Sequence, residues 1–281
     1  MLFRSPRKRR AQRALQDSGV ACLSYAAWAL WYLGYPDQAL KRSSEALALA
    51  QELSHPISLA WALDFAAMLY QHNREGQIAQ ERAEAAIRIC GEQGFAFWLA
   101  NGMVMRGWAL AEQGQLEEGI SQMRRGLAAW RATGAELARP YFHVLLAEAH
   151  GKVGQAQEGL ALVAEVLPIV EKNEDRFYEA ELYRLKGELT LQQFQVNSPH
   201  SAFRNPQLEA EECFQKAIEV ARRQHANSLE LRAVMGLARL WQQQGKREEA
   251  RQMLAEIYGW FTEGFDTVDL KEARALLQEL A

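Results

Sequence analysis

Residues 24–50, SYAAWALWYLGYPDQALKRSSEALALA, carry the pattern from which the fold can be predicted. Small residues stand at Ala27, Ala39 and Ala46, and Gly34 divides two runs in which apolar residues recur at spacings of three and four. This spacing places apolar side chains on one face of an α-helix. Glycine favours the left-handed conformation in which many helices end. The stretch therefore predicts two helices joined by a tight turn.

The same pattern recurs along the chain with a period of 40 residues. The small residue of the first helix recurs as Ala27, Ala67, Gly107, Ala147, Gly187 and Ala238, and that of the second as Ala39, Ala79, Gly119, Gly159, Ala210 and Ala250. The turn position holds Gly34, Gly114, Gly154 and Gly245, with Arg74 and Phe194 as exceptions. Small side chains let two helix axes approach closely. A helix pair cannot bury its apolar face alone, so successive pairs must stack.

The 281 residues divide on this register into a series of units. We expect an all-α, right-handed α-solenoid (a superhelix) of about six 40-residue helix-turn-helix repeats with a C-terminal capping helix. The expected boundaries are 1–19 for a basic tail, then 20–59, 60–99, 100–139, 140–179, 180–230 (with an insertion at 195–206) and 231–270, and 267–281 for the cap. Thr267 is the expected N-cap of that last helix.

The repeat resembles the tetratricopeptide repeat, abbreviated TPR. The resemblance is carried by small residues in the first helix, a turn glycine and Ala-x6-Ala in the second helix, as in Ala27, Gly34, Ala39 and Ala46. It departs from that family in its period, since 34 residues are usual there. The resemblance covers about residues 20–270.

A narrower resemblance is to the C-terminal TPR regions of large bacterial multidomain signalling ATPases, often fused to adenylate-cyclase-like or transcription-regulator domains. It is carried by residues 24–40, 106–120, 178–189 and 257–277. The resemblance implies a sensor or scaffold arm, with the chemistry done by other domains.

Charge and composition exclude several classes of protein. The net charge of -3 does not suit a nucleic-acid binder acting through bulk charge. Six positive charges do stand in the first fourteen residues, at Arg4, Arg7, Lys8, Arg9, Arg10 and Arg13. This tail is either a solvated end cut from a longer protein or a weak contact for nucleic acid or acidic lipid. The apolar stretch 20–35 is short for a bilayer and recurs as an ordinary repeat, so we expect a cytoplasmic protein.

No catalytic or metal-binding pattern stands out. Residues 151–154, GKVG, lack the phosphate-binding frame and are expected to form a turn. His143 and His150 stand at repeat positions that hold apolar residues in most of the other repeats. We therefore expect both side chains to be packed in the core and not to bind a metal. Cys22, Cys90 and Cys213 are expected to be buried, unpaired thiols. We therefore expect no enzyme activity, no cofactor and no metal.

By resemblance to TPR solenoids, the first helix of each pair lines a concave face. Positions on one side of these helices predict the lining, with aromatic side chains in the first four repeats and charged ones in the last two. The candidate binding residues are Trp28, Trp61, Asp64, Met68, Asn101, Trp108, Tyr141, Glu148, Glu181, Arg184, Glu188 and Arg239. The alternatives are that the tryptophans pack as core and that the charged residues form a solvated ion-pair face.

Buried aromatic side chains and arginine are the residues that most often anchor binding. We expect a non-enzymatic scaffold that binds a protein or peptide on the concave face. A sensor that binds a small-molecule inducer in the same groove is the alternative.

Overall fold

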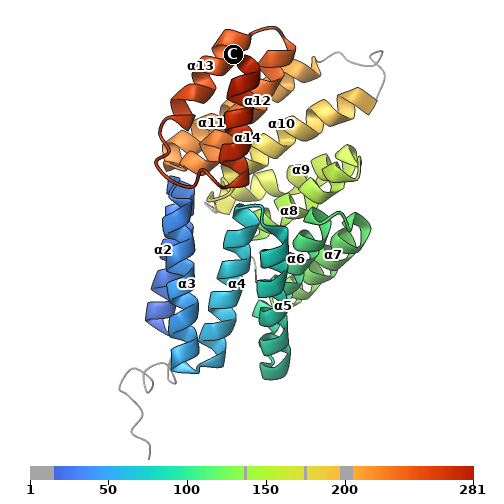
Figure 1. Cartoon of the computed structure of the whole chain (residues 1–281). Coiled ribbons are helices and arrows are strands. Elements are labelled where there is room, and N and C mark those ends of the chain that lie inside the picture. The colour runs from blue at the N-terminus through green and yellow to red at the C-terminus, as the bar shows by residue number, and fades with distance from the viewer. Residues whose placement is uncertain (1–15, 136–137, 174–175, 197–204) are drawn as a thin grey trace, which may run out of the picture. The chain divides into compact units, whose positions relative to one another are not determined.

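The computed structural model describes residues 16–135, 138–173, 176–196 and 205–281, and within these ranges it contains thirteen α-helices (Figure 1). They are α2 (Ser18–Leu33), α3 (Pro36–Leu53), α4 (Pro56–His72), α5 (Gly76–Gln93), α6 (Ala96–Glu112), α7 (Leu116–Ala132), α8 (Arg139–Lys152), α9 (Ala156–Asn173), α10 (Glu179–Val196), α11 (Pro206–Gln224), α12 (Asn227–Gln243), α13 (Arg247–Tyr258) and α14 (Val268–Leu280). The expected all-α fold of paired helices is confirmed. The second helices α3, α5, α7 and α9 begin 40 residues apart.

The turns inside the pairs are made by residues with a left-handed backbone. Gly34, Gly114, Gly154 and Gly245 have φ angles between +81° and +94°. At the equivalent turn position of the second repeat the residue is Arg74 instead of glycine. Its backbone takes the same left-handed conformation, at φ +61°. The backbone requirement therefore holds at this turn even where glycine is missing, and an L side chain is strained there.

The small residues lie where paired helices touch. The small residues that recur in the first helices and in the second helices of the repeats are all buried. A Cβ atom added to Gly107 would lie 2.7 Å from the backbone nitrogen of Met123, and one added to Gly119 would lie 2.6 Å from the carbonyl oxygen of Gly107. Gly126, further along α7, faces Val104, which comes earlier in α6. The two helices are therefore antiparallel and in backbone contact.

The chain divides into two compact units. Unit 1 comprises the described part of Met1–Trp31 together with Pro36–Ala135, and so holds α2 up to Trp31 and all of α3 to α7. Part of its core is formed where Ala46 and Ala50 of α3 meet Trp61 and Phe65 of α4. Within this unit α4 packs on both α5 and α6.

Unit 2 comprises Glu136–Ala281 with the short segment Tyr32–Tyr35, and holds α8 to α14. In this unit the first helix of each pair packs on the first helix of the next pair, α8 on α10 and α10 on α12. The last helix, α14, packs on α12. The expected apolar stripe of the last helix joins the core formed by α11, α12 and α13, with Leu270, Ala273, Leu276 and Leu280 buried and Leu277 partly buried.

Two local expectations need correction or fall outside the described residues. Thr267 does occupy the N-cap position of α14, but its hydroxyl donates to the carbonyl oxygen of Gly264 instead of capping the helix. The expected tail residues 1–15 and positions 197–204 of the insertion lie outside the described residues. After the insertion, the Asn205 side chain accepts from the backbone N–H of Gln207 and caps α11.

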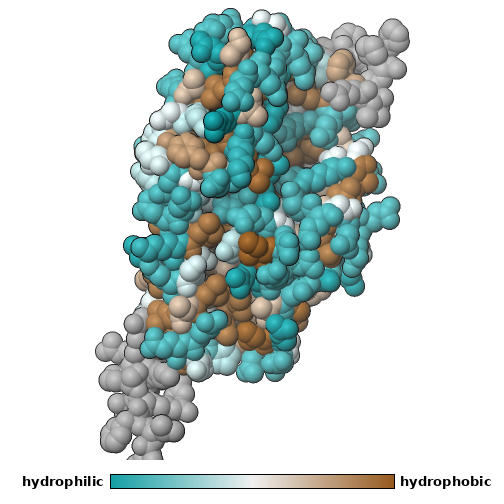
Figure 2. Space-filling view, viewed as in Figure 1, coloured by the Kyte–Doolittle hydropathy of each residue, from teal (hydrophilic) through white to brown (hydrophobic). Residues whose placement is uncertain are grey.

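Hydrophilic side chains cover most of the face drawn in Figure 2, and apolar side chains reach it in separate patches. Among the helices of the described ranges, none combines the length and the apolar character needed to cross a bilayer.

Candidate functional site

The twelve predicted binding residues all lie on the first helices of the pairs, but they fall into two groups. Unit 1 holds Trp28, Trp61, Asp64, Met68, Asn101 and Trp108, on α2, α4 and α6. Unit 2 holds Tyr141, Glu148, Glu181, Arg184, Glu188 and Arg239, on α8, α10 and α12.

In unit 1 the rings of five residues from three helices form a continuous series of ring contacts, called here the aromatic ladder: Tyr25 and Trp28 of α2, Trp61 and Phe65 of α4, and Trp98 of α6. The Phe65 ring stacks on Trp28 at a centroid distance of 4.6 Å and on Trp61 at 4.9 Å. The Trp61 ring lies 4.8 Å from that of Trp98. Tyr25 meets both Phe65 and Trp61 edge to face, at 5.1 and 5.7 Å.

One edge of the aromatic ladder is accessible to solvent. The Tyr25 side chain is 53 % exposed, and Trp28 and Trp98 are half-buried, while Trp61 and Phe65 are buried beneath them. The Trp28 indole N–H donates to the carbonyl oxygen of Phe65 at 3.4 Å, which fixes its ring against α4. Preformed aromatic surface of this kind loses little entropy when a partner covers it.

The polar candidates of unit 1 lie deeper than the ladder. Asp64 is fully buried on α4, and neither of its carboxylate oxygens has a hydrogen-bond partner among the described residues. Burial raises the pKa of this carboxyl well above its ordinary value. A Cβ atom added to Gly102 of α6 would lie 3.4 Å from the Asp64 Oδ1 atom, so the carboxyl points between helices and not toward solvent.

Asn101 and Trp108 of α6 are buried as well, and Met68 of α4 accepts a weak 3.7 Å hydrogen bond at its sulfur from the Asn101 amide. Within the described part of the chain, the Asn101 carbonyl oxygen and the indole N–H groups of Trp61 and Trp108 have no partner. These residues therefore fill the interface between neighbouring repeats instead of lining an open groove. The reason is that long first helices pack directly on one another, α4 on α6.

In unit 2 the charged candidates form an ion-pair network, defined here as Glu181, Arg184 and Glu188 of α10, Arg232 of α12 and Asp269 of α14. Arg184 donates to both oxygens of Glu181, at 2.9 and 2.7 Å, and pairs with Glu188 on its other side. Arg232 donates to Asp269 at 2.7 Å and lies 3.9 Å from Glu181. The network thus ties three helices together.

Burial and charge act in opposite directions on these guanidinium groups. Burial alone would lower the pKa of Arg184, but the Glu181 and Glu188 carboxylates hold that pKa well above its usual value. Burial likewise favours a lower pKa for Arg232, and the Asp269 and Glu181 carboxylates raise that pKa above its usual value. Because the charges neutralise one another inside the protein, this part of the face is a structural network and not the solvated ion-pair surface considered as an alternative.

The remaining candidates of unit 2 are not members of the ion-pair network, although the Glu148 charge also acts on Arg184. Tyr141 is buried on α8, and burial raises the pKa of its phenol well above the ordinary value. Glu148 pairs with Lys152 one turn along the same helix, at 3.3 Å. Arg239 is exposed and pairs with Glu272 at 3.2 Å, as expected for a solvated ion pair.

Several residues that build these faces were missed from the sequence. Tyr25, Phe65 and Trp98 complete the aromatic ladder, Asp269 belongs to the ion-pair network, and Tyr178 lies beside that network. Phe65 follows Trp61 by four positions and Tyr25 precedes Trp28 by three, so helical spacing alone would have placed both on the same side. Nothing in the repeat pattern indicates that Asp269 would reach Arg232.

The two histidines on apolar repeat positions and two of the three cysteines are buried, as expected from the sequence. His143 and His150 are buried, and their Nδ1 atoms lie 2.8 Å from the Arg139 carbonyl and 2.7 Å from the Gln155 side chain. Gly154 has φ +81° in the turn after α8. Cys90 and Cys213 are buried thiols, but Cys22 is exposed, because it lies on the solvent-facing side of α2. Among the described residues no group of three His, Cys, Asp or Glu side chains is arranged to hold a metal ion.

No protein-family model matches the chain, and no curated protein matches it. Among solved structures it is similar to the TPR-like repeats of a putative kinesin light chain from Podosopora anserina. A singly substituted form of those repeats matches with 20% identity and a TM-score of 0.48 over 70% of this chain and 92% of that one. A second form matches with 17% identity and a TM-score of 0.43 over 98% of each chain. The TPR2AB domain of yeast Sti1, in complex with pHSP90, matches with 13% identity and a TM-score of 0.37 over 93% of this chain and 98% of that one.

Proposed function

We propose that the chain is a non-catalytic scaffold that binds a segment of another protein through the aromatic ladder of unit 1. The observation that carries the proposal is the contacting group of Tyr25, Trp28, Trp61, Phe65 and Trp98, which has a buried base and an accessible edge. Aromatic side chains that are fixed before binding are typical anchors of protein interfaces.

The chemistry of the ladder favours a partner segment with apolar or aromatic anchor residues. Tyr25 and Trp28 lie three positions apart on α2, so both reach the same side of that helix. An amphipathic helix or extended peptide laid across α2 and α6 would cover Tyr25, Trp28 and Trp98 together. The ion-pair network of unit 2 then serves to fix the helices that carry it, and Arg239 is the one predicted residue there that remains exposed.

The finer assignment is the sensor or regulatory arm of a bacterial signalling ATPase or cyclase-type protein. It is supported by the resemblance of residues 24–40, 106–120, 178–189 and 257–277 to such regions. A cytoplasmic place is part of the same proposal, and the two buried free thiols, Cys90 and Cys213, suit a reducing compartment.

Affinity capture with matched variants tests the scaffold proposal. The full chain is immobilised and exposed to extract of its own organism, and the captured proteins are compared with those of a Tyr25→Ala/Trp28→Ala chain. Phe265→Ala in unit 2, whose side chain is 48 % exposed, is the control for loss of an exposed aromatic residue. We expect a captured protein that the double variant loses and the control keeps. Equal capture by all three chains would exclude the aromatic ladder as the binding surface.

A small-molecule sensor is the second candidate, and the buried polar groups of unit 1 favour it. The Asp64 carboxyl, the Asn101 carbonyl oxygen and the Trp108 N–H lack partners in the described structure, and a small polar ligand entering between α4 and α6 would satisfy them. A thermal-shift screen of metabolites separates the two candidates. A metabolite that stabilises the wild-type chain but not Asn101→Leu would favour the sensor, especially if no protein is captured.

A further inference from the structure

Unit 2 contains a groove that neither the aromatic ladder nor the ion-pair network uses. It has a volume of about 630 Å³ and is lined by residues of α11, α12 and α13, and it is called here the α11–α13 groove: Gln215, Ile218, Glu219, Arg222, Leu237, Trp241, Glu249, Gln252, Met253 and Glu256. All of these belong to unit 2.

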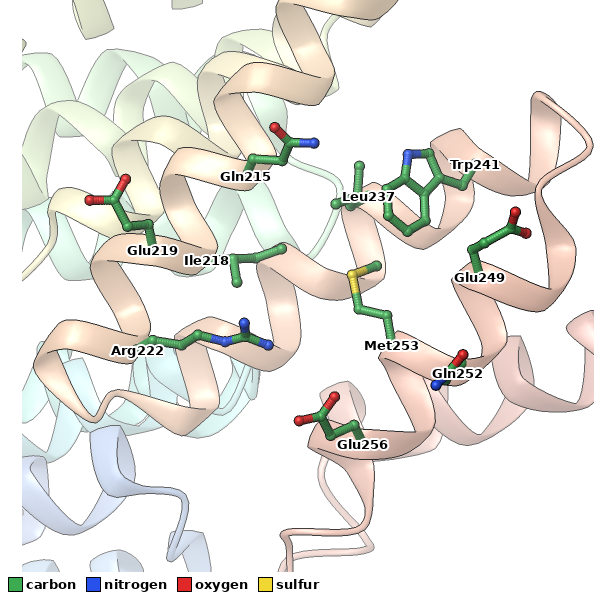
Figure 3. A pocket seen from close by; sticks show the side chains of 10 residues that line it. All are labelled: Gln215, Ile218, Glu219, Arg222, Leu237, Trp241, Glu249, Gln252, Met253 and Glu256. Atoms are coloured by element: carbon green, nitrogen blue, oxygen red, sulfur yellow. The ribbon is translucent and has the colours of Figure 1, made fainter.

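The floor of the groove is apolar. Figure 3 shows Ile218 of α11 and Met253 of α13 on facing sides of it, with Leu237 and Trp241 of α12 beside them. The Trp241 indole N–H donates to the Glu211 carboxylate at 2.9 Å, so the ring is held in place. Such a floor suits an apolar side chain inserted between the two outer helices.

The rim of the groove is acidic. Three carboxylates, of Glu219, Glu249 and Glu256, stand against one guanidinium group, of Arg222. Arg222 is bound to Glu230 at 2.6 Å, and Glu219 has a partner in Lys216 at 2.9 Å. Within the described ranges, neither Glu249 nor Glu256 takes part in a side-chain ion pair or hydrogen bond. They lie seven positions apart on α13, so both project along the same edge, about 10 Å from each other.

The chain itself contains a segment of the complementary kind. Residues 1–15, MLFRSPRKRRAQRAL, carry six positive charges and no acidic residue, and Leu2 and Phe3 stand directly before the first arginine. A segment with an apolar anchor followed by cations matches an apolar floor with free carboxylates at its edge. The segment precedes α2 of unit 1, whereas the groove lies within unit 2.

We propose that residues 1–15 of one chain dock in the α11–α13 groove of a second copy of the chain. The Leu2 and Phe3 side chains occupy the floor beside Met253, and the cations pair with Glu249 and Glu256. Because the segment and the groove are different surfaces, the contact is heterologous, and copies join head to tail. Ion pairs at a groove edge are screened by salt, so the association weakens as ionic strength rises.

Complementation between two full-length variants tests this arrangement. In the first variant Arg4, Arg7, Lys8, Arg9, Arg10 and Arg13 are all replaced by Gln, which removes the charges of the segment and keeps the groove. In the second, Glu249→Gln and Glu256→Gln remove the rim charges and keep the segment. Both glutamates are exposed, and circular dichroism with thermal unfolding checks that the two variants fold as the wild type does.

Analytical ultracentrifugation gives the readout. We expect the wild-type chain to self-associate as its concentration rises and each variant alone to remain monomeric. In an equimolar mixture, the charged segment of the second variant meets the intact groove of the first, so the mixture forms a 1:1 dimer that cannot grow further. Glu248→Gln, on the same helix but outside the groove, is the control and should associate as the wild type does.

A synthetic peptide of residues 1–15 provides the second measurement. It should bind the first variant, and it should bind the same variant carrying Glu249→Gln and Glu256→Gln about tenfold more weakly, since two surface ion pairs are lost. A wild-type chain that stays monomeric at all concentrations, a mixture that forms no dimer, or a peptide affinity unaffected by the rim substitutions would each overturn the proposal.

Discussion

Arg184 binds Glu181 with two hydrogen bonds, of 2.9 Å from Nε and 2.7 Å from a terminal guanidinium nitrogen, one turn apart on α10. The Glu181 side chain is 5 % exposed and that of Arg184 is 11 % exposed. Removing Glu181 would leave the buried Arg184 with Glu188 as its remaining close partner and would take a nearby carboxylate from Arg232. Substituting one residue of this pair therefore tests whether the ion-pair network stabilises the fold.

Glu181→Gln should lower the free energy of unfolding by about 3 kcal/mol, the usual cost of breaking one side of a buried pair. Urea unfolding followed by circular dichroism measures it. Arg239→Gln, which breaks the exposed pair with Glu272, should change the stability by less than about 0.5 kcal/mol. Equal effects of the two substitutions would show that the network does not hold α10 and α12.

Asp64→Asn should stabilise the protein near neutral pH and flatten its dependence on pH. Burial raises the pKa of Asp64 in the folded chain, whereas the unfolded carboxyl has a pKa of about 3.9. Below that value both states bind the proton. As the pH rises further, only the unfolded chain releases it, so stability falls until the pH reaches the folded pKa.

Thermal unfolding from about pH 4 to about pH 8 checks this behaviour, because the unfolded pKa lies at the lower end of that range. The wild type should lose stability across it relative to Asp64→Asn, and the variant should gain on the order of 1 kcal/mol near neutrality. Glu52→Gln on the exposed side of α3 is the control, and parallel curves for wild type and Asp64→Asn would contradict the prediction.

Arg74→Gly should stabilise unit 1. The backbone at this turn has φ +61°, a conformation that glycine adopts without strain and arginine does not. The expected gain is about 0.5–1 kcal/mol in unfolding free energy, measured by urea unfolding. Gly114→Ala places a side chain at φ +87° in the equivalent turn and should cost a similar amount. A loss of stability in Arg74→Gly would mean that contacts of the arginine outweigh its strain.

Gly107→Ala and Gly91→Ala form a matched pair of helical substitutions. A Cβ atom at Gly107 would meet the backbone of Met123 at 2.7 Å, whereas one at Gly91 meets nothing within 4 Å. Gly107→Ala should therefore destabilise by about 1–3 kcal/mol, and Gly91→Ala should stabilise by about 0.5–1 kcal/mol through helix propensity. Chemical denaturation of both variants decides whether α6 and α7 need their close approach.

The fold was predictable because it is repeated. The small residues at Ala27, Gly107 and Ala250 and the turn glycines Gly34 and Gly154 each signal one local requirement, and agreement among many copies makes the helix pairs evident. The conformation of Arg74 follows from the same register even though its residue type hides it.

The binding face was less predictable, because helical spacing shows which side of a helix a residue occupies but not what packs against that side. Asp64, Asn101 and Trp108 lie on the expected side and are nevertheless buried between neighbouring first helices. The contact of Arg232 with Asp269 joins residues 37 positions apart, and only the packing of α14 on α12 brings them together.

Photo-crosslinking from position 25 asks whether the aromatic ladder contacts a partner protein, since Tyr25 is the most exposed member of the ladder. A photoreactive phenylalanine analogue is placed at position 25 in one sample and at position 265, an exposed aromatic site of unit 2, in another. We predict a discrete crosslinked protein from position 25 that disappears when Trp28→Ala is added and that position 265 does not yield. The same product from both positions, or a product that survives Trp28→Ala, would contradict recognition by the ladder.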